Sequence, residues 1–311
     1  MSGEATNINT DKVSAGKFVT STVVLLKPRI IISVVFTGFA GMVLANRAIP
    51  DGNLIFYTLI SLFLSAGGSA IMNNVLDKDL DTLMDRLGSR VEAMKTVGNK
   101  QALILSIVLM AVALFISVYF INMVNAALIV LAILSYTVLY TLYLKRSSPY
   151  GTILGGIPGA LPVLIGYAAV EPSLGIGAWI LFIFMMLWQP PHFWALAQKY
   201  KDDYAKAKIP VMPVVFGTQY TNIFILLYSI SLIPLSLSLW FFGICTEYYA
   251  ILVLIVGIYF QYVMLSSVIS KSNYGKAFGV SILYMLCFML ILILDIYFNT
   301  DNSQNIFPLY R

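Results

Sequence analysis

The sequence predicts an all-α protein that crosses a lipid bilayer nine times. Of its 311 residues, 59% are hydrophobic and only 11% are charged, and the mean hydropathy is +0.87. Soluble domains carry roughly 25% charged residues, so an ordinary soluble protein is excluded. The high apolar content also excludes a disordered chain. The apolar runs are long and uninterrupted, whereas a membrane β-barrel would show alternating segments of about ten residues.

Nine segments approach the roughly 20 apolar residues that a helix needs to cross a hydrocarbon core of about 30 Å. They are 30–48, 53–75, 101–121, 124–144, 151–170, 174–197, 219–243, 249–270 and 277–297. The charge-free run from Gln101 to Leu144 is too long for one span. We therefore expect a turn near Asn122 and Asn125, which makes this run a helical hairpin.

The basic residues predict the orientation of the spans. With nine spans, 17 of the 19 Lys and Arg residues fall on one side of the membrane and two on the other. By the positive-inside rule the first side is cytoplasmic. We expect residues 1–26 to form a cytoplasmic tail without a cleaved signal, mobile over residues 1 to about 20. We expect 27–298 to form the membrane domain and 299–311 to form a tail outside. The net charge of +5 fits contact with anionic lipid and does not call for nucleic acid.

Cysteine and histidine are too few for most metal chemistry. Cys245 and Cys287 lie in apolar stretches without a ligand-spaced partner, and His192 is the only histidine in the chain. The sequence therefore indicates neither a disulfide framework nor a zinc site, and it excludes a metal centre with several histidines.

Acidic residues gather at the end of the second predicted span. Asn73, Asp77 and Asp81 recur every four residues and share one face of a helix. Carboxylates that repel one another at this spacing suit a divalent cation such as Mg²⁺, which takes one or two carboxylates together with phosphate oxygens. The alternative is a solvated helix end paired with nearby basic residues, but acids that continue an apolar span are usually functional.

A second acidic pair, Asp202 and Asp203, lies in the sixth loop, on the same predicted side of the membrane. Two acidic clusters together with many Lys and Arg residues suit a diphosphate clamped through Mg²⁺. His192 has two interpretations. A lone histidine is usually a satisfied core residue, but inside this bundle it could also be a ligand or a base.

The chain resembles the intramembrane UbiA-type prenyltransferases and, within them, the branch that farnesylates haem (the haem O synthases). The motifs that carry the resemblance follow in the family's order over about residues 25 to 217. They are LKPR at 26–29, NNVLDKDLDTLMDR at 73–86, YTVLYTLYLKR at 136–146, GALPVLIG at 159–166, WQPPHF at 188–193 and DYAKAKIPVMPV at 203–214.

The resemblance implies a UbiA-like bundle and transfer of the farnesyl group of farnesyl diphosphate to a vinyl group of haem b, with addition of water, to give haem O. It implies Mg²⁺ as the cofactor, haem b as a substrate, a bacterial inner membrane, and haem A synthase or terminal oxidase assembly factors as partners. The implied catalytic residues are Asn73, Asp77, Asp81, Asp202, Asp203 and His192, and the implied metal ligands among them are Asn73, Asp77, Asp81 and Asp203. The implied diphosphate-binding residues are Lys27, Arg29, Arg86, Arg90, Lys145, Arg146 and Lys199. The implied substrate-binding residues are Tyr136, Trp188, Gln189, His192 and Tyr204.

Two other functions remain open at this point. A prenyltransferase that acts on a quinone precursor such as 4-hydroxybenzoate would share the acidic motifs. A polytopic transporter could also carry acids in its spans, usually near the middle of the membrane at broken helices. The acids of this chain cluster instead at one predicted cytoplasmic end, which favours the enzyme.

Overall fold

The computed structural model describes residues 14–299, and within them nine helical segments are long and apolar enough to cross a membrane. They match the nine predicted spans to within a few residues, and no strand occurs in the described chain. Their bounds are α2 (Pro28–Asn46), α3 (Gly52–Leu76), α6 (Asn99–Phe120), α7 (Met123–Leu134) continued by η2 (Ser135–Leu144) and α8 (Lys145–Ser147), α9 (Gly151–Leu154) with α10 (Ile157–Val170), α11 (Ile176–Lys199), α14 (Gly217–Phe241), α15 (Glu247–Ser270) and α16 (Tyr274–Phe298).

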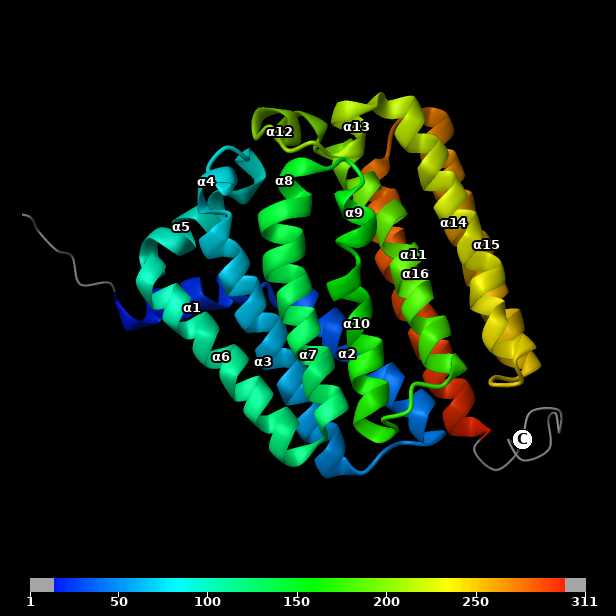
Figure 1. The fold of residues 1–311 in the computed structure, drawn as a ribbon. Helices are drawn as coiled ribbons and strands as arrows, with labels where there is room; N and C mark the ends of the chain where they lie inside the picture. The colour runs from blue at the N-terminus through cyan, green and yellow to red at the C-terminus, as the bar shows by residue number, and fades with distance from the viewer. Residues whose placement is uncertain (1–13, 300–311) are drawn as a thin grey trace, which may run out of the picture.

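Short helices in the connections gather toward one end of the bundle (Figure 1). They are α4 (Lys78–Asp81), η1 (Asp85–Leu87), α5 (Gly88–Val97), α12 (Lys201–Lys206) and α13 (Met212–Val215). Helix α16 ends at the opposite end of the bundle. The second and sixth connections, which carry the two acidic clusters, therefore lie at the same end.

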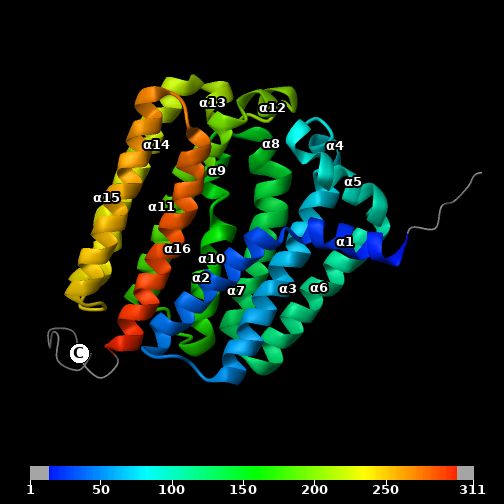
Figure 2. The ribbon, with the colours of Figure 1, turned by 180° about the vertical axis from the view of Figure 1, so that it is seen from behind.

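The segment before the first span differs from the expected tail. Residues Ala15–Leu26 form helix α1, which lies crosswise to the spans and packs against α5 and α3 (Figure 2). Leu25 is fully buried in a small cluster that includes Ile71 and Ala102, while Val19 on the other side of α1 is 60% exposed. Residues 15–20 of the expected mobile tail are thus helical instead, and the buried Leu25 anchors α1 against the bundle. Residues 1–13 of that tail, and residues 300–311 of the C-terminal one, lie outside the described chain.

The turn expected in the long charge-free run is present between α6 and α7. The side chain of Asn122 accepts a hydrogen bond from the Asn125 N–H at 2.9 Å, which caps α7, and donates one to the Ala168 carbonyl at 2.7 Å. Buried Asn125 donates to the Ile165 carbonyl at 2.7 Å. Backbone groups in a bilayer must find partners within the protein, so these amides fix the turn against α10.

The main core lies among α2, α10, α11, α14, α15 and α16, and α11 is the most enclosed of the spans. Helices α2 and α10 cross with their backbones in contact, because Gly38 and Gly166 face each other without side chains. Small residues allow this close approach, which is the common way for helices to pack in a bilayer. Helix α6 keeps most of its apolar surface on the outside, where lipid would cover it.

Candidate active site

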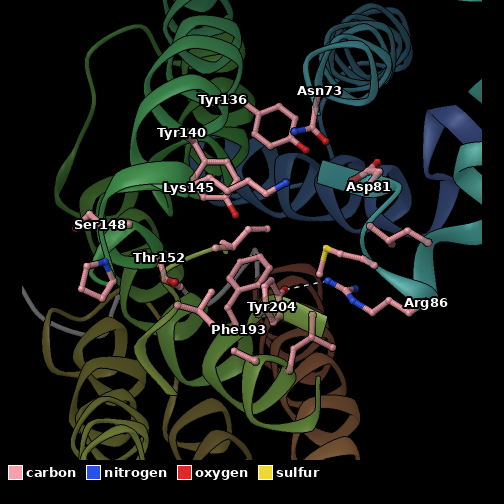
Figure 3. A pocket seen from close by; sticks show the side chains of 18 of the residues that line it. Asn73, Asp81, Arg86, Tyr136, Tyr140, Lys145, Ser148, Thr152, Phe193 and Tyr204 are labelled. Carbon is pink, nitrogen blue, oxygen red and sulfur yellow. Dashed lines mark hydrogen bonds between the residues drawn. The ribbon is translucent and has the colours of Figure 1, made fainter. Parts of the chain in front are cut away.

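A pocket opens at the end of the bundle that carries the short helices (Figure 3). Its volume is about 180 Å³, less than the roughly 300–1,000 Å³ of pockets that enclose a drug-sized ligand. Its polar lining residues are Lys27, Asn73, Asp81, Arg86, Arg90, Tyr136, Tyr140, Lys145, Ser148, Thr152 and Tyr204, and its apolar ones are Met84, Leu87, Pro149, Gly151, Phe193, Leu196, Ala197, Ile209 and Val211. The pocket is thus polar and basic on one side and apolar on the other.

Asn73 and Asp81 both reach the pocket because the helix is almost continuous between them. Helix α3 ends at Leu76, Asp77 joins it to α4, and the backbone N–H of Asp81 still bonds to the carbonyl of Asp77 at 2.9 Å. The helical register therefore continues, and the two side chains point to the same side of the helix. This confirms that Asn73 and Asp81 share a face.

Asp77 lies behind this pair and is fully buried. Its carboxylate is 2.5 Å from Lys145 Nζ and 3.2 Å from an Arg146 nitrogen, and it accepts a hydrogen bond from Asn73 Nδ2 at 2.8 Å. A buried charge is tolerated only when it is paired and hydrogen-bonded in this way. Asp77 therefore fixes Asn73, Lys145 and Arg146 in place.

Asp81 is only 3% exposed, and one of its oxygens, Oδ2, is 3.2 Å from Arg90 Nη1. The other oxygen, Oδ1, is buried and has no hydrogen-bond partner in the described chain. A buried carboxylate oxygen without a partner is costly. Asp85, by contrast, points outward with a side chain that is 79% exposed and pairs with Lys206 at 2.7 Å.

The wall opposite Asp81 is a stretch of π-helix, η2, which carries Tyr136 and Tyr140 (Figure 3). Thr141 is buried here: its hydroxyl donates to the Tyr136 carbonyl at 2.8 Å and accepts from Asn73 Nδ2 at 3.0 Å. The Tyr140 ring lies directly on the backbone of Gly155, where a side chain would collide with it. π-Helical turns are rare and often occur at functional sites.

The second and sixth connections meet over the pocket through Arg86. An Nη2 hydrogen bond of 3.0 Å joins it to the Tyr204 hydroxyl, and its Nε is 4.0 Å from Asp203. The Arg86 guanidinium also lies over the Tyr200 ring, at 5.0 Å from its centre. Burial raises the pKa of the Tyr204 phenol. Asp202 is exposed, and neither it nor Asp203 lines the pocket, so of the second acidic pair only Asp203 approaches the site, through Arg86.

Lys27 donates a 2.7 Å hydrogen bond to Asn73 Oδ1 from the junction of α1 and α2. Loss of hydration lowers the pKa of its ammonium well below the usual range, and the nearby Arg90 and Lys145 lower it further. Arg29 of the same motif is exposed and does not line the pocket. Lys199 lies instead in a separate cavity at the end of α11.

The three predicted residues of the WQPPHF motif lie in the packed core beside the pocket. His192 Nδ1 is 2.6 Å from Ser281 Oγ, and its ring is stacked between Trp188 and Phe278 at centre distances of 4.6 and 4.4 Å. Trp188 donates to the Ser281 carbonyl at 2.8 Å, and Gln189 donates to the Gly156 carbonyl at 2.7 Å. None of the three lines the pocket, whereas the next residue, Phe193, does.

Several pocket residues were not singled out from the sequence as site residues. They are Met84, Leu87, Tyr140, Ser148, Thr152, Phe193, Leu196, Ile209 and Val211, with Thr141 directly behind Asn73. Tyr140 and Phe193 stand inside the quoted motifs, so proximity to Lys145 and His192 was a usable signal for them. Uncharged residues such as Thr152 give no such signal in an apolar sequence.

One end of this membrane bundle holds a carboxylate, an amide and several cationic side chains around a pocket, which are the groups that bind a diphosphate through Mg²⁺. The chain belongs to the UbiA prenyltransferase family, whose model matches residues 34–288.

Within that family, the similar curated proteins are protoheme IX farnesyltransferases. The one from Geotalea uraniireducens is 42% identical over 82% of this chain and 98% of its own length. The one from Aquifex aeolicus is 40% identical over 92% of this chain and 98% of its own length.

Solved structures share the fold at lower identity. A digeranylgeranylglyceryl phosphate synthase superposes with a TM-score of 0.73 at 19% identity, over 90% of this chain and 99% of that one. A UbiA homologue from Archaeoglobus fulgidus, solved with GPP and Mg²⁺, superposes with a TM-score of 0.62 at 15% identity, over 88% of this chain and 99% of that one.

Proposed function

We infer that this integral membrane protein transfers the farnesyl group of farnesyl diphosphate to a vinyl group of haem b, which gives haem O and diphosphate. The observation that carries the prenyl-transfer half is the pocket itself, where Asn73 and Asp81 face four cationic side chains. The acceptor is inferred from the relatives named protoheme IX farnesyltransferase, which this chain matches over nearly their whole length.

We propose Mg²⁺ as the cofactor, and the residues present fit it. No three His, Cys, Asp or Glu residues converge within residues 14–299, but Mg²⁺ usually takes only one or two carboxylates and completes its shell with water and phosphate oxygens. The unpartnered Asp81 Oδ1 and the side-chain carbonyl of Asn73 are hard oxygen donors at the pocket. We assign the metal to Asn73 and Asp81, with Asp77 and Asp203 in support. A bound Mg²⁺ supplies charge stabilisation for the departing diphosphate.

The cations of the pocket bind the diphosphate. Lys27, Arg86, Arg90 and Lys145 all line it, and Arg146 holds the geometry from behind through Asp77. Fixed cations aimed at a leaving group stabilise the negative charge that develops there, and a site with little water strengthens the effect. We assign Lys27, Arg90 and Lys145 to the diphosphate, with Arg86 placed by Tyr204 and Asp203.

The reaction breaks the bond between C1 of the farnesyl group and the diphosphate oxygen, which keeps the electron pair. The vinyl electrons of haem b form the new bond to C1. Water then adds to the carbon next to the porphyrin ring and loses a proton, which gives the hydroxyethylfarnesyl group. The rings of Tyr136 and Tyr140 line the pocket with centres 6.1 Å apart. Ring faces of this kind stabilise a developing carbocation.

The pocket is so small that it has room for the diphosphate end of the donor but not for the farnesyl chain. The apolar lining residues, among them Phe193 and Leu196, mark the side on which the farnesyl chain leaves toward the lipid. We propose that haem b approaches through the same apolar side. We also propose that the enzyme lies in a bacterial inner membrane with the pocket on the cytoplasmic face, where haem A synthase or oxidase assembly factors would take up the product.

The test uses the full chain purified in detergent with farnesyl diphosphate, haem b and Mg²⁺, and detects haem O by mass. We expect haem O and free diphosphate in equal amounts. Parallel reactions replace haem b by 4-hydroxybenzoate. Prenylated 4-hydroxybenzoate without any haem O would overturn the acceptor and leave a quinone-precursor prenyltransferase. The absence of both products, from protein that elutes as a single species, would overturn prenyl transfer itself.

A further inference from the structure

A second cavity lies beside the candidate active site, on the other side of the last turn of α11. Its volume is about 550 Å³. Its lining residues come from the ends of four spans and are Gln198, Lys199, Lys201, Thr218, Lys271, Asn273, Tyr274, Gly275 and Lys276. Leu196 and Ala197 of the same turn line the active-site pocket. We call this second site the lysine cavity.

The charge of the lysine cavity is all of one sign. Lys199, Lys201, Lys271 and Lys276 line it, and no carboxylate does. None of these four lysines forms an ion pair within residues 14–299; Lys199 only stacks over the Tyr200 ring at 5.0 Å. The neighbouring Asp202 is exposed and does not line the cavity. Four like charges that repel one another in one hollow are stabilised by a bound anion.

The floor of the cavity is polar and fixed. Buried Gln198 donates hydrogen bonds to the Thr218 carbonyl at 3.1 Å and to Asn222 Oδ1 at 3.0 Å. Asn222 Nδ2 in turn donates to the Tyr274 hydroxyl at 2.9 Å. This network joins α11, α14 and α16 at the cavity and holds the helix ends that carry Lys199 and Lys276 together.

The turn that enters α16 adds to this arrangement. Lys271 and Asn273 both have positive φ angles, 50° and 60°, so both adopt the left-handed conformation in the turn between α15 and α16. The start of α16 has no side-chain cap, and its first residues line the cavity. Uncapped N–H groups at a helix start carry partial positive charge, which reinforces the lysines.

We propose that the lysine cavity binds a phosphate group, carried either by the headgroup of an anionic phospholipid or by free diphosphate. The cavity opens where the spans end, which is the level of lipid headgroups, and basic pockets between spans at this level bind anionic lipid. Its volume is about three times that of the active-site pocket, which leaves room for a headgroup. The proposal concerns binding and does not depend on the prenyl acceptor.

The test is native mass spectrometry of the full chain in detergent with added phosphatidylglycerol or phosphatidylcholine. The variant is Lys201→Gln/Lys271→Gln/Lys276→Gln, and the control Lys95→Gln/Lys100→Gln/Lys208→Gln removes the same charge from exposed positions outside the cavity. We expect the wild type and control to retain phosphatidylglycerol in preference to phosphatidylcholine. The cavity variant should bind phosphatidylglycerol about tenfold more weakly or worse, because each basic residue near a membrane surface contributes to lipid affinity.

Inorganic diphosphate distinguishes the two sources. Phosphatidylglycerol that stays bound against millimolar diphosphate assigns the cavity to lipid. A second bound diphosphate in the wild type and control that the cavity variant lacks assigns it to the free anion, because the active-site pocket can hold the first one in all three proteins. The charge-keeping variant Lys201→Arg/Lys271→Arg/Lys276→Arg should bind like the wild type, which separates lost charge from lost folding. Equal binding of phosphatidylglycerol and of diphosphate by the cavity variant and the control overturns the proposal.

Discussion

The two carboxylates of the first acidic motif differ in what surrounds them. Both oxygens of buried Asp77 have partners among Lys145, Arg146 and Asn73, so its removal would leave these three groups without their shared partner and disturb folding as well as binding. Asp81 has one free oxygen at the pocket. A substitution at Asp81 is therefore the cleaner test of ligand binding.

Asp81→Asn is expected to lower kcat/KM for farnesyl diphosphate by on the order of 100-fold, because charge stabilisation through a metal is worth several kcal/mol. The Mg²⁺ concentration for half-maximal rate should rise at the same time. Asp85→Asn is the matched control: it makes the same chemical change at a carboxylate that is 79% exposed. Exposed ion pairs contribute only about 0.2–1 kcal/mol, so its rate should stay near that of the wild type. Equal rates for both variants would remove Asp81 from the metal site.

The neighbours of His192 favour the role of a satisfied core residue over that of a haem contact. Its ring is stacked on both faces, and Ser281 occupies Nδ1. We expect His192→Phe to keep the stacking, to lose about 1 kcal/mol of stability with the hydrogen bond, and to leave the absorption spectrum of added haem b unchanged. Visible spectra and turnover with haem b measure this. A Soret band that shifts with the wild type but not with the variant would restore the role of His192 as a haem ligand.

At the scale of elements, the sequence was sufficient to predict the spans but not the distortions of the helices within them. Hydropathy and length located all nine helical segments, and the amides at Asn122 and Asn125 located the hairpin turn. The π-helix at Ser135–Leu144 was not foreseen, because it arises from tertiary contacts of Thr141 and Tyr140 and not from an unusual local composition.

The same limit applies to the site. A four-residue period predicted that Asn73 and Asp81 share a face, since helical periodicity is local. The exclusion of His192, Arg29 and Lys199 from the pocket depends on how α2, α11 and α16 are rotated about their own axes. That rotation is set by packing between spans, which a single sequence rich in apolar residues on all sides does not encode visibly.

The crossing of α2 and α10 gives a test at this scale. Gly166→Ala is expected to destabilise the fold by about 1–3 kcal/mol or more, because its new methyl group would meet the backbone of Gly38, which cannot move aside alone. Gly279→Ala makes the same change in α16, where no atom lies within 4 Å, and should unfold like the wild type. Thermal unfolding in one detergent compares the two. Identical midpoints would mean that the helices separate easily at this crossing.

At the scale of the whole molecule, the basic residues and both cavities lie at the same end of the bundle. The short helices of the second and sixth connections, the active-site pocket and the lysine cavity all occupy one end of the bundle. That is also the end to which the positive-inside rule assigns 17 of the 19 basic residues. Several of these basic residues line the two cavities, so the residues that are predicted to orient the protein are also the ones proposed to bind its ligands.

This coincidence predicts which side of the membrane the pocket faces. In a background of Cys245→Ala/Cys287→Ala, a cysteine at exposed position 99 (Asn99→Cys), at the start of α6, marks the pocket end. One at exposed position 173 (Ser173→Cys), before α11, marks the other end. A membrane-impermeant maleimide added to intact cells should label Ser173→Cys and leave Asn99→Cys unlabelled until the cells are permeabilised. The reverse pattern would place the pocket outside the cell, where the positive-inside rule would fail and farnesyl diphosphate made in the cytoplasm would have no direct path to Asn73 and Asp81.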